Sequence, residues 1–191
     1  MSQATSEETL RAVTIGELVV LAGPVVLADY DPGWTTAFER EATRIRGALG
    51  DRVSLLEHVG STSVPGLPAK PIIDIVLAVP DSTDEDAYVP PMEAAGYVLR
   101  IREPEWFEHR LFKGVDQEAN IHVFTVGTAE IDRMLAFRDW LRSHDDDRSL
   151  YERTKRDLAA RDWKYVQHYA DAKTDVVAAI MSRALAEHDA R

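Results

Sequence analysis

The sequence contains no cysteine, and this absence excludes two kinds of structure. No disulfide framework can form, and no thiolate can hold a metal ion. A bound metal must therefore be held by Asp, Glu, His or water, which suit Mg²⁺ or Mn²⁺ better than structural zinc. We expect Mg²⁺ or Mn²⁺ as the cofactor if the protein uses a metal.

Long apolar runs are missing as well. No stretch approaches the roughly 20 residues that a membrane-spanning helix needs. The first residues, MSQATSEETLRAV, also lack the basic-then-apolar order of a signal peptide. We therefore expect a soluble, cytoplasmic protein that has no membrane partner.

The sequence has no dense block of lysine and arginine. Its 33 acidic residues outnumber 22 basic ones and give a formal charge of −11. Such a surface repels phosphates, so we expect no nucleic acid polymer as a partner. A small anion needs only one lysine and a few backbone N–H groups, so a phosphorylated small molecule is compatible with this charge.

Two familiar catalytic motifs are absent. No Gly-x-x-x-x-Gly-Lys-Ser/Thr occurs, which excludes a P-loop kinase. Without Gly-x-Ser-x-Gly or cysteine, nucleophilic hydrolase mechanisms have no visible anchor.

A chain of 191 residues is most simply one compact domain. We expect residues 1–24 to be an N-terminal extension and residues 25–188 to form the domain. Its sheet part should run to about residue 127 and its helical part over about 129–188. The apolar stretch TIGELVVLAGPVVL at 14–27 is interpreted as a helix or a strand attached to the extension.

The spacing of apolar residues predicts the elements of the domain. Apolar residues at 34, 38, 42, 45 and 49 have the spacing of a helix face. Alternating or continuous apolar segments predict strands at 53–59, 71–79, 97–102, 107–113 and 119–126. A short helix should end at Gly96, and three helical stretches should cover 131–144, 149–163 and 165–188. The pattern predicts an α/β or α+β fold, with a mixed sheet of about five strands flanked by helices and a helical C-terminal part.

One stretch stands out chemically, EHVGSTSVPGLPAKPIIDIVLAVP at 57–80. The strand ending at Gly60 and Ser61 leads into a tight turn whose N–H groups can converge on an oxyanion. Asp74 lies inside an apolar strand, where a lone carboxylate is costly unless it meets a cation or hydrogen-bond donors. It either takes part in a site or bonds the backbone and hydroxyls of 61–63 to hold the turn.

The segment HVGSTSVPGLPAKPIIDI closely resembles the signature of the GrpB family, bacterial nucleotidyltransferase-like proteins of which some are fused to dephospho-coenzyme A kinase. The resemblance extends from about Val26 to Ala184 and implies a nucleotidyltransferase-like fold. In nucleotidyltransferases a Gly-Ser turn precedes a strand with Asp-x-Asp or Asp-x-Glu. This chain has Val76 at the second acidic position, and His122 is the best-placed residue for the third.

The resemblance implies a modified site with Asp74 and His122 as its catalytic residues. Two-metal phosphoryl chemistry needs several carboxylates, so this site should hold at most one divalent ion. Asp74 and His122 would bind it together with Glu57 or His58. Because adjacent strand residues face opposite sides, only one of Glu57 and His58 can point toward Asp74.

The expected ligand contacts are of three kinds: the turn residues, a lysine or arginine on the sheet, and lysines on the C-terminal helices. Each has a plainer alternative, namely a turn bonded to itself, a solvated surface residue, or a packing stripe edged by lysines. The residues are Gly60, Ser61, Thr62, Ser63, Lys70, Arg110, Lys155 and Lys173.

Three functions follow as hypotheses. In the first, the protein binds a nucleotide or other phosphorylated small molecule and, if it is an enzyme, catalyses metal-dependent nucleotidyl or phosphoryl transfer. In the second, it is a non-catalytic accessory or regulatory module with a protein partner, related to the domain fused to dephospho-coenzyme A kinase. In the third, it is an ATP-using ligase or transferase of small biosynthetic substrates.

Overall fold

The computed structural model describes residues 4–21, 23–114 and 118–189. Its centre is a five-stranded sheet in the order β1-β2-β5-β4-β3. The strands are β1 (Leu55–Val59), β2 (Ile73–Val79), β3 (Val98–Glu103), β4 (His109–Lys113) and β5 (Ala119–Thr125). β2 and β5 are parallel, whereas the other three neighbouring pairs are antiparallel. The predicted mixed sheet is therefore confirmed.

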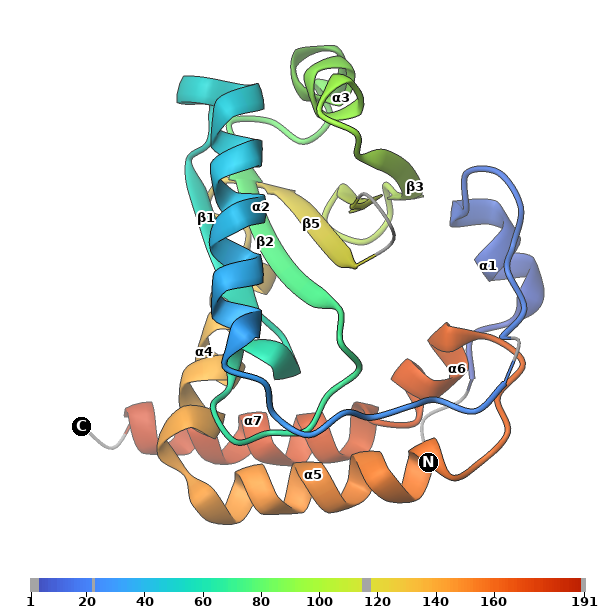
Figure 1. The fold of residues 1–191 in the computed structure, drawn as a ribbon, viewed down its shortest axis with the longest axis vertical. Coiled ribbons are helices and arrows are strands. Elements are labelled where there is room, and N and C mark those ends of the chain that lie inside the picture. The colour runs from blue at the N-terminus through green and yellow to red at the C-terminus, as the bar shows by residue number, and fades with distance from the viewer. Residues whose placement is uncertain (1–3, 22, 115–117, 190–191) are drawn as a thin grey trace.

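Helices cover both faces of this sheet and close its lower end (Figure 1). α2 lies in front of the sheet, α4 lies behind it, and α5 and α7 run below it. Within the described residues, no helix is both long and apolar enough to cross a bilayer. The helices are α1 (Glu7–Val13), α2 (Gly33–Leu49), α3 (Glu85–Ala94), α4 (Ala129–Ser143), α5 (Asp145–Ala159), α6 (Val166–Asp171) and α7 (Thr174–Asp189), with short 3-10 turns η1 (Gly50–Arg52) and η2 (Ser61–Ser63).

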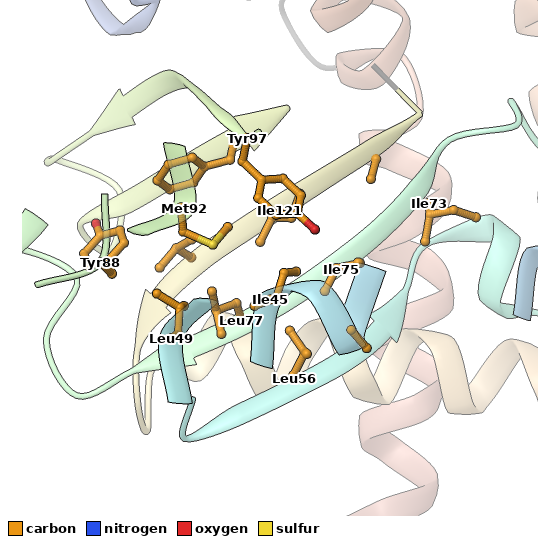
Figure 2. Close-up of a cluster of buried hydrophobic side chains, with 14 of the residues drawn as sticks. Ile45, Leu49, Leu56, Ile73, Ile75, Leu77, Tyr88, Met92, Tyr97 and Ile121 are labelled. Atoms are coloured by element: carbon orange, nitrogen blue, oxygen red, sulfur yellow. The ribbon is translucent and has the colours of Figure 1, made fainter. Parts of the chain in front are cut away.

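The main core lies between the sheet and helices α2 and α3 (Figure 2). The predicted apolar face of α2 supplies Ala42, Ile45 and Leu49, which are fully buried. From β2, the side chains of Ile75 and Leu77 reach the same cluster. We call this side of the sheet the α2 face.

The opposite side, which we call the α4 face, carries the alternate residues of each strand. Val76 of β2 packs there with Phe124 of β5 and Ile131 of α4. β2 is apolar on both sides because both sides are covered. Asp74 belongs to the α4 face as well, but it lies at the start of β2.

Four predicted elements differ from the structure. The helix predicted at 149–163 is α5 at Asp145–Ala159, four residues earlier at both ends. The described part of 14–27 is neither a helix nor a strand, apart from an isolated bridge at Thr14, because its apolar residues cover other elements irregularly. β4 begins at His109 instead of 107, since Phe107 and Glu108 adopt φ angles of 55° and 51° that end the extended chain. The last helical stretch is split into α6 and α7 near Lys173.

Candidate functional site

The turn between β1 and β2 approaches the start of β2 closely. Gly60 has a φ of 68°, and a Cβ atom added to it would lie 2.5 Å from Oδ2 of Asp74. Only glycine allows both this backbone conformation and this contact. The turn therefore brings Gly60, the residue before Ser61, next to the carboxylate of Asp74.

Asp74 is bound by its neighbours on the α4 face. Nδ2 of Asn120 donates to its Oδ1 at 2.7 Å, and Nζ of Lys113 donates to Oδ1 of Asn120 at 2.5 Å. Nε2 of His122 lies 3.9 Å from Oδ1 of Asp74. Burial raises the pKa of Asp74, but His122, Asn120 and the charge of Lys70 together lower it below its ordinary value. Asp74 is therefore ionised at neutral pH.

Two hydrogen bonds lead from His122 toward the edge strand β3. Nδ1 of His122 lies 3.1 Å from Nε2 of His109, and Nδ1 of His109 lies 2.7 Å from Oε2 of Glu103. The Glu103 carboxylate only accepts, so Nδ1 of His109 carries a hydrogen. Burial lowers the pKa of His109, and its neutral Nε2 then accepts from Nδ1 of His122. This arrangement leaves Nε2 of His122 as the nitrogen that faces Asp74.

Four lysines surround Asp74 and Ser61, and we call this group the lysine site. They come from four different parts of the chain: the segment before β2, the end of β4, helix α5 and the link between α6 and α7. The chain has only five lysines among its 22 basic residues, so nearly all of them gather here. The members are Lys70, Lys113, Lys155 and Lys173.

Lys155 lies deepest in the lysine site. Its side chain is 2% exposed, and Nζ donates to Oγ of Ser61 at 3.0 Å and to the carbonyl of Pro68. Nζ also lies 5.0 Å from the centre of the Tyr151 ring. Burial, aided by the charge of Lys173, lowers its pKa to about 7.

Lys70 and Lys173 share one aromatic ring. Their Nζ atoms lie 5.8 Å and 4.6 Å from the centre of the Tyr169 ring. Neither Nζ has a hydrogen bond or ion pair within the described part of the chain. The hydroxyl of Tyr169 is buried and likewise has no partner among those residues. These groups are donors that the protein itself leaves unused.

The lysine site is electrostatically costly. Burial lowers the pKa of Lys70, Lys113 and Lys173, and the charge of Lys173 lowers that of Lys70 further. Asp74 partly offsets this effect at all three lysines. Clustered cations with one carboxylate among them destabilise the fold unless an anion joins them, which is the usual arrangement of an anion-binding site.

Two of the predicted turn hydroxyls are used within the turn. Oγ1 of Thr62 lies 3.0 Å from Nε2 of His58 and donates to the carbonyl of Ile72. Oγ of Ser63 donates to the carbonyl of Gly60 at 2.6 Å. Both side chains are buried, so we assign them to holding the turn instead of contacting a ligand.

His58 and Glu57 lie away from the expected metal position. His58 is on the α2 face, stacked on Phe38, and its burial lowers its pKa to about 4. Glu57 is on the α4 face with Asp74, but its Oε2 accepts from Arg138 at 2.8 Å. Strand alternation separates the two residues, as expected, and neither joins Asp74.

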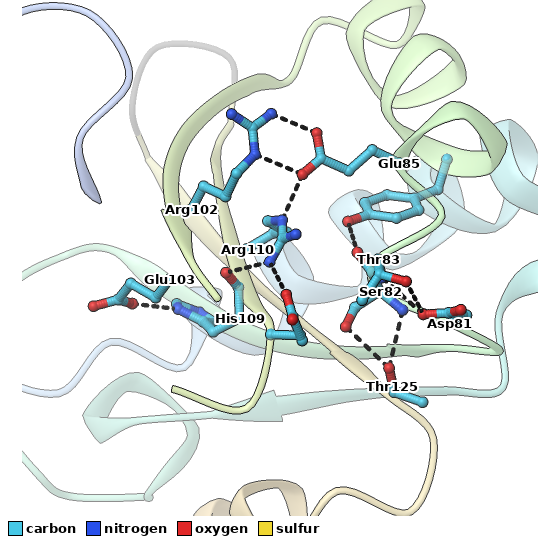
Figure 3. A network of polar contacts seen from close by, with 11 residues as sticks. Asp81, Ser82, Thr83, Glu85, Arg102, Glu103, His109, Arg110 and Thr125 are labelled. Atoms are coloured by element: carbon cyan, nitrogen blue, oxygen red, sulfur yellow. Dashed lines mark hydrogen bonds and ion pairs between the residues drawn. The ribbon is translucent and has the colours of Figure 1, made fainter. Parts of the chain in front are cut away.

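Arg110 lies on the opposite side of the sheet from Asp74, and its side chain points toward Glu85 (Figure 3). It lies on the α2 face, and its Nε donates to Oε1 of Glu85 at 2.6 Å. Arg102 donates to the same carboxylate, and these hydrogen bonds lower the pKa of Glu85 to about 2. This position corrects the expectation that Arg110 grips a phosphate. His109, the next residue on the strand, faces the site instead.

The donors present do not fit a metal centre. Among the described residues, no three Asp, Glu, His or Cys side chains are grouped closely enough to hold an ion. Of the carboxylates in the described part of the chain, Asp74 is the one that acts on Lys70, Lys113 and Lys173, and these cations repel a divalent metal. The expected group of Asp74, His122, Glu57 and His58 is therefore not assembled.

Four groups of the site were absent from the expected set. They are Lys113, Asn120, His109 and Glu103, and they meet because β2 pairs with β5, β5 with β4, and β4 with β3. Alternation along HRLFK does place His109, Leu111 and Lys113 on one face. This alternation shows which residues face Asp74 only once the pairing of β4 with β5 is known.

Comparisons with known proteins agree with this architecture. The chain matches the family described as GrpB protein over residues 24–183. The UPF0157 protein of Halalkalibacterium halodurans is 58% identical over 96% of this chain and 94% of its own length. The crystal structure of conserved protein GrpB from Enterococcus faecalis has a TM-score of 0.76 and 31% identity, covering 85% of this chain and 99% of that one. A protein of Mycolicibacterium paratuberculosis named dephospho-CoA kinase is 30% identical over 74% of this chain and 41% of that protein.

The matched region contains the turn at Gly60, strand β2, helix α5 with Lys155, and the link between α6 and α7 with Lys173. The resemblance carried by HVGSTSVPGLPAKPIIDI is therefore confirmed at the level of the family. The chain belongs to the GrpB protein family.

Proposed function

We propose that this protein binds a phosphorylated small molecule, with nucleotides as the leading candidates, at the lysine site between the sheet and the C-terminal helices. The observation that carries the proposal is the convergence of four of the chain's five lysines on Asp74 and Ser61. Lysines that share a partly buried site gain most from a compact, highly charged anion such as a phosphate.

The unused donors support the same conclusion. Lys70, Lys173 and the Tyr169 hydroxyl can each donate to an anion without breaking a bond to another described residue. By contrast, the fifth lysine, Lys164, is exposed and paired with Glu7 at 2.5 Å. The difference favours a ligand role for the clustered lysines over a general structural use of lysine in this chain.

Nucleotidyl or phosphoryl transfer is the finer form of the proposal. It draws on the similarity of the Gly60-Ser61 turn and Asp74 to nucleotidyltransferases. In this form Nε2 of His122, held by His109 and Glu103, accepts the proton of an attacking hydroxyl beside Asp74. The hydroxyl oxygen bonds to phosphorus as the bond from that phosphorus to the departing phosphate group breaks. The lysines offset the charge that develops on the phosphate oxygens. Metal ions have no assigned step, because the donors around Asp74 do not suit one.

A thermal-shift series tests the binding proposal. We expect nucleotides and inorganic phosphates to raise the melting temperature of the full chain in EDTA, and added MgCl₂ to bring little further gain. The double variant Lys70→Ala/Lys173→Ala should lose this response. The matched control is Lys164→Ala, which removes an exposed lysine outside the site and should respond like the wild type. A full response in the double variant, or none in the wild type, would refute the proposal.

A second candidate is an accessory or regulatory role beside a dephospho-CoA kinase. It is favoured by the relatives of that name, in which the matched region makes up 41% and 47% of the protein. The chain would then contact a separate kinase. Size-exclusion chromatography of the purified chain with the kinase of the same organism checks this. Co-elution, with altered kinase turnover, supports the role, whereas separate elution at micromolar concentrations counts against it.

A further inference from the structure

The charges of the lysine site indicate how large an anion it takes. Among the described residues, the four lysines and the carboxylate of Asp74 give a formal charge of +3 when all the lysines are protonated. Glu152 and Arg156, which also act on Lys155, carry opposite charges and leave this sum unchanged. A phosphate monoester carries roughly −2 at neutral pH, and a diphosphate ester therefore carries about −3. The diphosphate ester is the one that neutralises the site.

The spacing of the cations points the same way. Lys113 reaches Asn120 on β5, on one side of β2, whereas Lys155 reaches Ser61 at the end of β1, on the other side. The two strands that flank β2 are about 10 Å apart, or twice the usual strand separation. An anion between Lys113 and Lys155 is therefore approached from both sides of β2, and two linked phosphates offer more oxygens for this than one phosphate does.

The remaining donors lie on the helical side of the site. Lys70 and Lys173 are held over Tyr169, whose hydroxyl is unpaired among the described residues. Together with Ser61, they provide enough donors for the oxygens of more than one phosphate. The protein keeps these cations in partly buried positions, at a cost in stability that an anion of matching charge removes.

We propose that the lysine site is specific for a diphosphate group, so that the ligand is a diphosphate ester such as a nucleoside diphosphate instead of a monophosphate. This inference rests on the proposed function and names the chemical class of its ligand.

Lys155 provides a measurable consequence. The charges that act on it are those of Lys173, Glu152 and Arg156, and its direct contacts are Ser61, Tyr151 and the carbonyl of Pro68. With a pKa of about 7, it is largely neutral at pH 8 in the free protein. A bound diphosphate raises this pKa, so binding at pH 8 must take up part of a proton.

Isothermal titration calorimetry of the full chain in EDTA tests the class of ligand. The probes are ADP, AMP, pyrophosphate and orthophosphate at constant salt. We expect ADP and pyrophosphate to bind at least tenfold more tightly than AMP and orthophosphate. Lys113→Ala should weaken the binding of ADP more than the binding of AMP, because it removes the cation at one end of the site. Lys164→Ala is the control and should keep the wild-type preference.

Proton uptake is measured by repeating the ADP titration at pH 8 in two buffers of different ionisation enthalpy. We expect uptake in the wild type and its loss in Lys155→Met, with circular dichroism confirming that this variant is folded. Equal affinities for AMP and ADP, a tenfold preference for ATP over ADP, or unchanged uptake in Lys155→Met would each overturn the inference. In those cases phosphate binding itself would stand, whereas a lack of binding by every probe would refute the proposed function too.

Discussion

Gly60 and Asp74 are in such close contact that the turn leaves no room for a side chain between them. A Cβ atom at Gly60 would lie 2.5 Å from Oδ2 and 2.9 Å from Cβ of Asp74. Sequence positions fourteen apart thus form a single structural unit, in which the turn and the carboxylate position each other. Ser61 and its lysine partner depend on the same contact.

Gly60→Ala should therefore damage both the fold and the site. We expect a loss of about 2 kcal/mol in the free energy of unfolding, since the residue must hold a φ of 68° and displace Asp74. Urea denaturation measures this loss. Gly47→Ala is the control, because a methyl group at this position meets no atom within 4 Å. Position 47 is inside a helix, so the alanine variant should be slightly more stable than the wild type. Equal stabilities of the two variants would contradict the close contact.

Arg110 should be important for stability and irrelevant to ligand binding. Its side chain is 6% exposed and paired with Glu85, which also binds Arg102. We expect Arg110→Met to cost about 2 kcal/mol of unfolding free energy, because it removes a buried charge-assisted hydrogen bond. ADP affinity, measured by calorimetry, should not change. If the variant lost ADP affinity while its stability stayed unchanged, Arg110 would have to contact the ligand.

The ion pairs of Glu85 should be lost in acid, when the carboxylate is protonated. Its folded-state pKa is lowered to about 2, mainly by Arg102, from an ordinary value of 4.5. A depressed carboxylate pKa stabilises the fold above the unfolded value and loses this effect as the pH falls toward 2. Unfolding free energy should therefore drop between about pH 4.5 and 2 in the wild type and drop less in Glu85→Gln. An equal drop in both proteins would assign acid sensitivity to other groups.

The lysine site should make the free protein more stable in mild alkali than at neutral pH. The pKa of Lys155 is lowered to about 7, and those of the other three lysines are lowered as well. Between about pH 7 and 10 the unfolded chain binds more protons than the folded one, so stability rises with pH. Buried tyrosines, whose pKa values are raised, reverse the trend above about pH 10.

Urea denaturation at several pH values checks this slope. Lys155→Met should flatten this slope, because it removes the lysine whose pKa is lowered to about 7. Lys164→Ala should keep it, since the pKa of Lys164 is raised by its pairing with Glu7. A wild-type stability that falls steadily from pH 7 to 10 would be incompatible with the lysine site as described.

Glu103 should raise the pKa of His109 and so partly offset the lowering caused by burial. Burial lowers that pKa, and the hydrogen bond to the Glu103 carboxylate partly opposes the effect. In Glu103→Gln we expect the pKa of His109 to fall further and the unfolding free energy to drop by about 1 kcal/mol. Ring ¹⁵N chemical shifts followed through a pH titration report both the pKa and the tautomer. Glu105→Gln, at an exposed position, is the control.

Much of the fold was determined by the local sequence. The spacing of apolar residues at 34, 38, 42, 45 and 49 produced helix α2, because those residues share one helix face that the sheet buries. The continuous apolar run of β2 implied a central strand covered on both faces. The turn at Gly60 could also be predicted from the local sequence. A glycine followed by hydroxyl residues indicates a tight turn with a positive φ angle.

Only the tertiary structure decided which side chains meet. Alternation separated His109 from Arg110, but which of them faces Asp74 depends on the pairing of β4 with β5 and of β5 with β2. The gathering of Lys70, Lys113, Lys155 and Lys173 depends likewise on contacts between segments far apart in the chain. Local spacing determines the face on which a side chain lies, whereas long-range packing determines what lies opposite that face.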